Sequence, residues 1–200
     1  MNTSDGVGAR VVQTAGPVLI IGSGLLGASL GLALRAGGVR VYLEDASPTS
    51  LHLASDVGAG QAFGDVLAEA GVRPRECGSD TPSYQAPSIV VVATPPDVAD
   101  RVIVESLLRF PDAIVTDVAS VKDAVVADVL RGLEREGRLE EASRYVGSHP
   151  MAGRERSGAG AADADLFYGR PWVIVAHEST WPRAVLVARA LATDVGAVPL

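Results

Sequence analysis

Short, continuous runs of apolar residues recur along the chain, separated by amphipathic stretches and turn residues. Runs that stay apolar throughout are typical of strands buried on both faces of a sheet. The clearest of them, SIVVVAT, occupies residues 88–94. The pattern predicts strands over 17–21, 39–43, 88–94, 113–118, 144–147, 171–176 and 197–200.

Between these runs, apolar residues return at intervals of three and four, which predicts helices. Ser47 followed by Pro48, and Ser120 farther along the chain, are typical residues for helix starts. We expect a polar, glycine-rich loop over 148–164 and a loose tail over 1–16. The predicted helices cover 25–37, 48–57, 65–70, 95–110, 120–137 and 180–195.

The alternation of strands and helices predicts an α/β fold, a doubly wound and mostly parallel sheet with helices on both faces. Residues 17–200 would form one domain of this kind, because 200 residues suffice for a single core. A hydrophobic content of 48% with 20% charged residues argues against disorder.

Charge and composition narrow the range of partners. A formal net charge of −7 argues against nucleic acid, whose binders carry a basic surface. The single cysteine, Cys77, excludes an internal disulfide framework. No uncharged apolar run is long enough for a membrane span, and the N-terminus lacks the apolar core of a signal peptide. We therefore expect a cytoplasmic protein that binds neither nucleic acid nor a membrane, and we expect no metal site.

A glycine motif, G-x-G-x-x-G, is formed by Gly22, Gly24 and Gly27 between a predicted strand and a predicted helix. In this context the motif binds a dinucleotide and indicates a Rossmann-type domain. The first glycine permits a tight turn, the second lets the backbone approach the pyrophosphate, and the third lets the helix pack closely. The free N–H groups at the helix start, around Leu25 and Leu26, would face the phosphates.

Asp45 follows the next predicted strand, about 18 residues after Gly27, where an acid hydrogen-bonds the adenosine ribose. A carboxylate there repels a 2′-phosphate, and no arginine follows in residues 46–48, so we expect NAD rather than NADP. Glu44 is the alternative, since strand alternation lets only one of the two face the ribose. We choose Asp45 because it stands at the very end of the strand, although it could instead cap the following turn.

Thr94 and Pro95 stand at the C-terminal end of a further predicted strand, the edge at which such sheets bind their ligands. There they would contact the nicotinamide half of the cofactor. Thr94 would serve equally well as the N-cap of the helix that follows. The sequence leaves both roles open.

Two further polar segments follow predicted strands: DVASVK at 117–122 and GSHPMAGRERSG at 147–158. With the glycine motif, the turn ATPP and the segment LFYGRPW at 166–172, they resemble the prephenate dehydrogenase family. The resemblance covers residues 18–200 and is most specific in HPMAG.

This resemblance implies the NAD-dependent oxidative decarboxylation of prephenate to 4-hydroxyphenylpyruvate, a step of tyrosine biosynthesis. His149 would be the catalytic histidine, with Ser120 as its hydrogen-bonding partner near the substrate hydroxyl. A neutral imidazole suits proton removal near pH 7. Lys122 would bind substrate or pair with Asp117. Glu155 would bind substrate or gate the pocket, unless it is a solvated loop charge.

Family members continue into a helical C-terminal domain that forms a homodimer and completes the substrate site, whereas this sequence ends at Leu200. We therefore expect weak or no turnover from these residues alone. Two alternatives stay open. One is an arogenate dehydrogenase, whose substrate carries an amino group in place of the keto group, and the other is a non-catalytic NAD-binding module.

Overall fold

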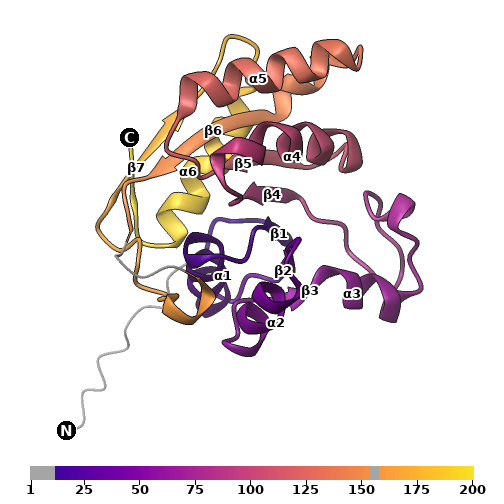
Figure 1. The fold of residues 1–200 in the computed structure, drawn as a ribbon, viewed down its shortest axis with the longest axis vertical. Helices are drawn as coiled ribbons and strands as arrows, with labels where there is room; N and C mark the ends of the chain where they lie inside the picture. The colour runs from indigo at the N-terminus through magenta and orange to yellow at the C-terminus, as the bar shows by residue number, and fades with distance from the viewer. Residues whose placement is uncertain (1–11, 154–157) are drawn as a thin grey trace, which may run out of the picture.

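The computed structural model describes residues 12–153 and 158–200. Its strands form a single sheet in the order β3-β2-β1-β4-β5-β6-β7-β8, which Figure 1 shows extending across the molecule. Neighbouring strands are parallel except β6 and β7, which are antiparallel. The strands are β1 (Val18–Ile21), β2 (Val41–Glu44), β3 (Gln61–Ala62), β4 (Ile89–Val92), β5 (Ile114–Asp117), β6 (Tyr145–Pro150), β7 (Pro171–Val175) and β8 (Val198–Pro199).

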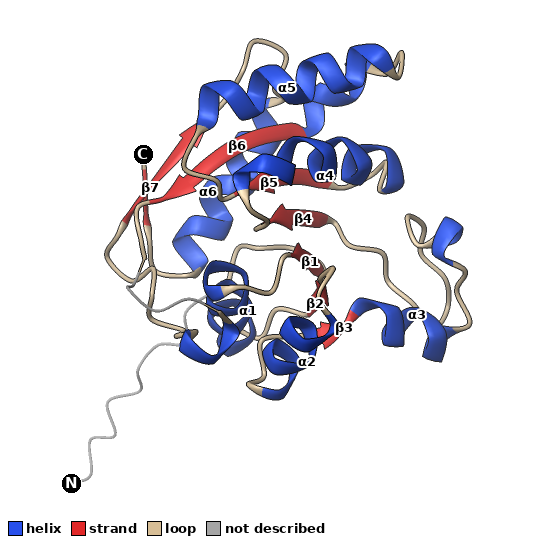
Figure 2. Cartoon of the chain, viewed as in Figure 1, coloured by secondary structure: helices blue, strands red, loops and turns tan. Residues whose placement is uncertain are grey.

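Helices connect most of the strands, so that helix and strand alternate along the chain as the sequence predicts (Figure 2). The α-helices are α1 (Leu25–Ala36), α2 (Pro48–Asp56), α3 (Phe63–Ala70), α4 (Pro96–Arg109), α5 (Lys122–Arg135) and α6 (Pro182–Asp194). The described residues also contain the short 3₁₀ helices η1 (Pro74–Glu76), η2 (Leu139–Arg144) and η3 (Ala159–Ala161). Within the two described ranges, no helix is both long and apolar enough to cross a membrane.

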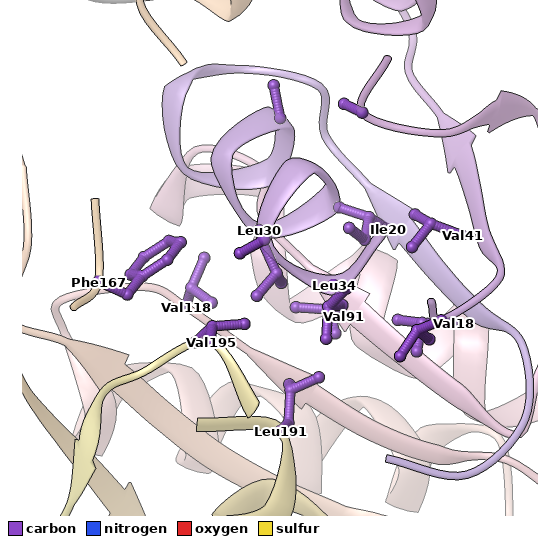
Figure 3. Packing of buried hydrophobic residues seen from close by; sticks show 14 of the residues in the cluster. Val18, Ile20, Leu30, Leu34, Val41, Val91, Val118, Phe167, Leu191 and Val195 are labelled. Atoms are coloured by element: carbon purple, nitrogen blue, oxygen red, sulfur yellow. The ribbon is translucent and has the colours of Figure 1, made fainter. Parts of the chain in front are cut away.

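The core consists of two layers because side chains alternate between the faces of each strand. Val18 and Ile20 of β1 contribute to the layer that contains α1 and α6, whereas Leu19 contributes to the layer that contains α3, α4 and α5. Figure 3 shows the first layer, in which apolar side chains of α1 and α6 meet those of the central strands. The labelled side chains from these elements are Leu30, Leu34, Leu191, Val18, Ile20, Val41 and Val91.

The α/β fold class predicted from the sequence is confirmed, and one predicted helix cap is present. The Ser47 side chain accepts a hydrogen bond from the Ser50 backbone N–H, and Pro48 is the first residue of α2. The short strand β3 was not predicted. Its two residues gain their strand character from pairing with β2 rather than from any local pattern.

Two local predictions are wrong. Ser120 does not cap a helix, because α5 begins at Lys122 and its N-cap position, Val121, makes no side-chain cap hydrogen bond. The predicted loop over 148–164 begins too early, because β6 continues through Pro150. Pairing with β7 places His149 opposite Val173 and thereby extends the strand.

The segment before β1 is held against the domain where the structure describes it. Backbone N–H groups of Gln13 and Thr14 donate to the Asp194 carboxylate at 2.6–3.1 Å. The Ser88 hydroxyl donates to the Ala15 carbonyl at 2.6 Å. The predicted loose tail over 1–16 therefore does not extend to residues 13–15, and residues 1–11 lie outside the described part of the chain.

Candidate functional site

The strand order creates a crevice at the centre of the sheet. The sheet extends from β1 through β2 to β3 in one direction and through β4 to β8 in the other. At such a reversal point the loops leave the carboxyl ends of the two central strands on opposite sides, which opens a ligand-binding crevice. Ile21, the last residue of β1, lies opposite Glu44 and Val92, the last residues of β2 and β4. The three strand ends are therefore level at one edge of the sheet.

A cavity of about 780 Å³ lies at this edge. Residues that follow β1, β2 and β4 line it, together with one side of α4. Seven of the eight sequence-predicted cofactor residues line it, and Gly27 does not. The seven are Gly22, Gly24, Leu25, Leu26, Asp45, Thr94 and Pro95.

The three motif glycines meet different steric demands. Gly22 has a φ of +105°, and a Cβ there would lie 2.5 Å from the Ala93 carbonyl oxygen. A Cβ on Gly27 would lie 1.9 Å from the Gly22 carbonyl oxygen, so this position brings α1 close to the loop. A Cβ on Gly24 would meet no atom within 4 Å. Gly24 therefore leaves open space where a ligand could approach the backbone.

The N-terminus of α1 meets the cavity at Leu25 and Leu26. Its N-cap, Gly24, provides no side-chain hydrogen bond, and the first turn contains no acidic residue. The first N–H groups of a helix have no partner within the helix, and the helix dipole makes this end positive. This end of the cavity is therefore suited to a phosphate group.

The two acids at the end of β2 have different partners. The Asp45 carboxylate accepts hydrogen bonds from the Ser23 backbone N–H at 2.5 Å and the Ser47 backbone N–H at 2.7 Å. The Glu44 carboxylate instead accepts two bonds from Nη1 of Arg109, at 2.9 and 3.0 Å. Asp45 is thus fixed beside the glycine loop, by which we mean residues 22–27, the turn after β1 together with the start of α1. A ribose would follow the phosphates at this position. Glu44 is instead paired with the Arg109 cation.

Thr94 carries a polar atom without a partner. Its Oγ1 is buried and makes no hydrogen bond within the described residues. The helix-capping alternative for Thr94 is wrong, because the N-cap of α4 is Pro95 and no side chain caps this helix. A buried hydroxyl without a partner is costly, and a polar ligand in the cavity would supply the missing hydrogen bond.

A buried ionic cluster joins the ends of β5 and β6. The Asp117 carboxylate is fully buried and accepts hydrogen bonds from the Tyr145 hydroxyl at 2.8 Å and the Ala119 backbone N–H at 2.9 Å. Lys122 Nζ forms an ion pair with the same carboxylate. Burial raises the pKa of Tyr145, and the neighbouring negative charge of Asp117 raises it further.

Lys122 also reaches the strand that carries His149. Its Nζ donates to the Ser148 carbonyl oxygen at 2.6 Å, in addition to pairing with Asp117. Burial lowers the pKa of Lys122, and the Asp117 carboxylate opposes part of that shift. Of the two roles that the sequence left open, the ion pair is present in the structure. It holds the peptide between Ser148 and His149 against the end of β5.

The two predicted catalytic residues emerge from neighbouring strands. His149 lies near the end of β6 and is partly buried, whereas Ser120 is exposed in the loop after β5. Since β5 and β6 are parallel neighbours, both residues lie at the same edge of the sheet as the cavity. Neither residue lines the 780 Å³ cavity. Glu155 lies outside the described residues.

Sequence reasoning missed the contribution of α4. Val98, Val102 and Arg109 line the cavity from one side of this helix. Their spacing by four and seven residues is the periodicity of a single helix face. That periodicity could have identified the face, but not the strand end that it opposes.

Residues 12–153 and 158–200 contain no group of three or more His, Cys, Asp or Glu residues placed to hold a metal ion.

Comparison with known proteins gives matches that agree with one another. A family model described as prephenate dehydrogenase, nucleotide-binding domain, matches residues 30–199. The chain is 37% identical over 182 residues to the probable prephenate dehydrogenase NovF of Streptomyces niveus, covering 91% of this chain and 44% of that protein. The chain spans less than half the length of the curated relatives it matches.

Solved structures show the same likeness. Prephenate dehydrogenase from A. aeolicus, in complex with hydroxyphenyl propionate and NAD+, superposes with a TM-score of 0.74 and 26% identity, over 93% of this chain and 59% of that one. Synechocystis arogenate dehydrogenase gives a TM-score of 0.72 at 24% identity, over 92% of this chain and 58% of that one. At that identity the second comparison shows the fold alone.

Proposed function

Because this chain belongs to the family of prephenate dehydrogenase nucleotide-binding domains, we propose that it binds NAD+ in the cavity at the ends of β1, β2 and β4. We propose further that it provides the catalytic histidine for the oxidative decarboxylation of prephenate to 4-hydroxyphenylpyruvate. The observation that carries the proposal is the glycine loop, which is sterically closed at Gly22 and Gly27 and open at Gly24.

The cofactor fits the groups that line the cavity. The N-terminus of α1 would hold the pyrophosphate, and Asp45 would accept hydrogen bonds from the adenosine ribose. Thr94, whose Oγ1 is buried without a partner within the described residues, would gain one from the nicotinamide half. When bound, NAD+ supplies the acceptor for the hydride that leaves the substrate.

His149 would act on the substrate hydroxyl. A neutral imidazole accepts the hydroxyl proton as the hydride leaves the carbinol carbon, so that the C–O bond becomes a carbonyl. The C–C bond to the ring carboxylate then breaks and releases CO₂, and the electron pair of that bond enters the ring. The ring becomes aromatic as the carbonyl π electrons move onto the oxygen, which takes back a proton to form the phenol hydroxyl. Ser120, from the neighbouring strand end, would hydrogen-bond the histidine or the hydroxyl and orient the pair. Positioning of this kind supplies a large part of the rate enhancement.

Two alanine substitutions in the glycine loop separate folding from binding. Gly24→Ala should leave the melting temperature unchanged, because its Cβ meets no protein atom and its φ of −72° suits alanine. The same substitution should weaken NAD+ binding at least about tenfold, since the methyl group enters the space where the pyrophosphate would approach. Calorimetric titration with NAD+ and a thermal melt would measure the two effects.

Gly27→Ala is the matched comparison. Its Cβ would lie 1.9 Å from the Gly22 carbonyl oxygen, so α1 must shift, and we expect a loss of about 1–3 kcal/mol in the free energy of unfolding. Unchanged NAD+ affinity in the Gly24→Ala protein would contradict the proposed binding site. A melting temperature that falls equally in both proteins would contradict the steric distinction between the two glycines.

Turnover tests the substrate. The protein at its full natural length should reduce NAD+ when supplied with prephenate, and mass spectrometry should identify 4-hydroxyphenylpyruvate as the product. Turnover with arogenate alone would identify the relative that acts on the amino substrate. NAD+ binding without turnover of either compound would support a non-catalytic module. The cytoplasmic location expected from the sequence and the homodimer expected from the family resemblance stay predictions.

A further inference from the structure

A guanidinium group lies in the proposed cofactor cavity, although the residues that follow β2 include no arginine. Arg109, the last residue of α4, lines the cavity together with Glu44, Asp45 and Gly24. It comes from a helix far along the chain. The prediction of NAD rather than NADP rests partly on the absence of arginine from residues 46–48. That argument covers only residues next to β2 in the sequence, so it does not cover Arg109.

Arg109 is held in place by four neighbours. Nη1 donates to both carboxylate oxygens of Glu44 at 2.9 and 3.0 Å, and Nε donates to the Cys77 sulfur at 3.2 Å. The guanidinium carbon lies 5.3 Å from the centre of the Phe63 ring and 5.0 Å from that of Phe110. Both distances are within the range of a cation–π contact. The guanidinium therefore has a defined position at the end of β2.

The charges that line this cavity disfavour a phosphate at the ribose. Glu44, Asp45 and Glu105 contribute carboxylates to its wall, and Arg109 is the cation among its lining residues. Glu44 forms an ion pair with Arg109, with 2.9 Å between Oε1 and Nη1. The positive charge of an arginine paired in this way is largely balanced by the carboxylate, whereas a free guanidinium binds a phosphate with parallel hydrogen bonds.

We propose that Glu44 selects the cofactor by occupying Arg109, a latent receptor for the adenosine 2′-phosphate of NADP. Asp45 would recognise the ribose hydroxyls, and Glu44 would neutralise the cation that otherwise attracts the additional phosphate. This proposal rests on the proposed NAD+ site. It keeps Asp45, the acid chosen from the sequence, as the ribose ligand, and it gives Glu44 a separate role that acts through Arg109.

The substitution Glu44→Gln tests the proposal, because glutamine keeps the size of the side chain and removes its charge. We expect NADP+ to bind at least about tenfold more tightly than to the unsubstituted protein, since one repulsive charge is lost and one attractive charge is released. The dissociation constant for NAD+ should change by less than about threefold. Calorimetric titrations with NADP+ and NAD+ would measure both, and adenosine 2′,5′-bisphosphate against AMP would test the adenosine end alone.

Two further variants distinguish release of Arg109 from a general change of charge. The double variant Glu44→Gln/Arg109→Gln should lose the gain in NADP+ affinity. Glu105→Gln removes an equal charge from the exposed wall of the same cavity and should give a gain of less than about threefold. The proposal is overturned if the double variant keeps the gain or if Glu105→Gln reproduces it.

A thermal melt of each variant checks its folding, and the NAD+ titration checks its cofactor site. A Glu44→Gln protein that melts normally and binds NAD+ but shows no gain for NADP+ would overturn the role of Glu44. If glutamine disturbs the fold, Glu44→Ala provides the same test without a polar side chain. Failure of the unsubstituted protein to bind NAD+ would instead overturn the proposed function, and the two failures are therefore distinguishable.

Discussion

If the proposed prephenate oxidation takes place, replacing His149 with asparagine should lower its kcat by about 10²- to 10⁴-fold, the usual contribution of a general base. Asparagine retains a polar side chain of similar reach but cannot accept the hydroxyl proton. His149 does not line the cavity at the ends of β1, β2 and β4, so the dissociation constant for NAD+ should stay within about twofold. Steady-state kinetics and calorimetric NAD+ titration of the protein at its natural length would measure the two quantities.

His52 offers the matched control for this experiment. It is an exposed residue of α2, and His52→Asn should leave kcat unchanged. An unchanged kcat in the His149→Asn enzyme would remove the histidine from the proposed chemistry. A parallel loss of NAD+ affinity would show instead that the side chain supports the cofactor site.

Replacing Lys122 with methionine should lower the free energy of unfolding by about 3–5 kcal/mol, because it leaves the fully buried Asp117 carboxylate without its paired cation. The hydrogen bonds from Tyr145 and the Ala119 backbone would remain, but they do not balance the charge. Methionine fills a similar volume, so the loss reports the ion pair rather than a cavity. Denaturant unfolding, monitored by circular dichroism, would measure it.

Arg131 provides an exposed ion pair for comparison. It pairs with Asp128 on the surface of α5, with side-chain exposures of 69% and 40%, so Arg131→Met should cost less than about 1 kcal/mol. The double variant Asp117→Asn/Lys122→Met should recover part of the loss, because no unpaired charge is then buried. Equal effects at Lys122 and Arg131 would contradict a structural role for the buried pair.

The fold class could be predicted from the sequence because its signals are local. A strand buried on both faces requires a continuous apolar run, and a helix that covers a sheet requires an apolar face. Both patterns lie within a few neighbouring residues. The errors fall where a neighbouring element decides the outcome: pairing with β2 creates β3, and pairing with β7 continues β6 through Pro150.

The glycine loop is the part of the candidate site that the sequence predicts best. Its constraints arise within a few residues, as the 1.9 Å approach of a Gly27 Cβ to the Gly22 carbonyl shows. The role of Thr94 could not be chosen from the sequence, since a threonine before a helix fits a cap and a ligand contact equally well. The structure excludes the cap and leaves the hydroxyl buried at the cavity.

The sequence by itself determined the alternation of strands and helices and the turn that opens a dinucleotide crevice, because neighbouring residues encode both. The tertiary structure alone decided the partners of the charged groups. It placed Arg109 against Glu44, across 65 residues of sequence, and Lys122 against the Ser148 carbonyl, across 26. No local pattern specifies such pairs, because they depend on the order in which the strands join the sheet and on which helix end meets which strand end.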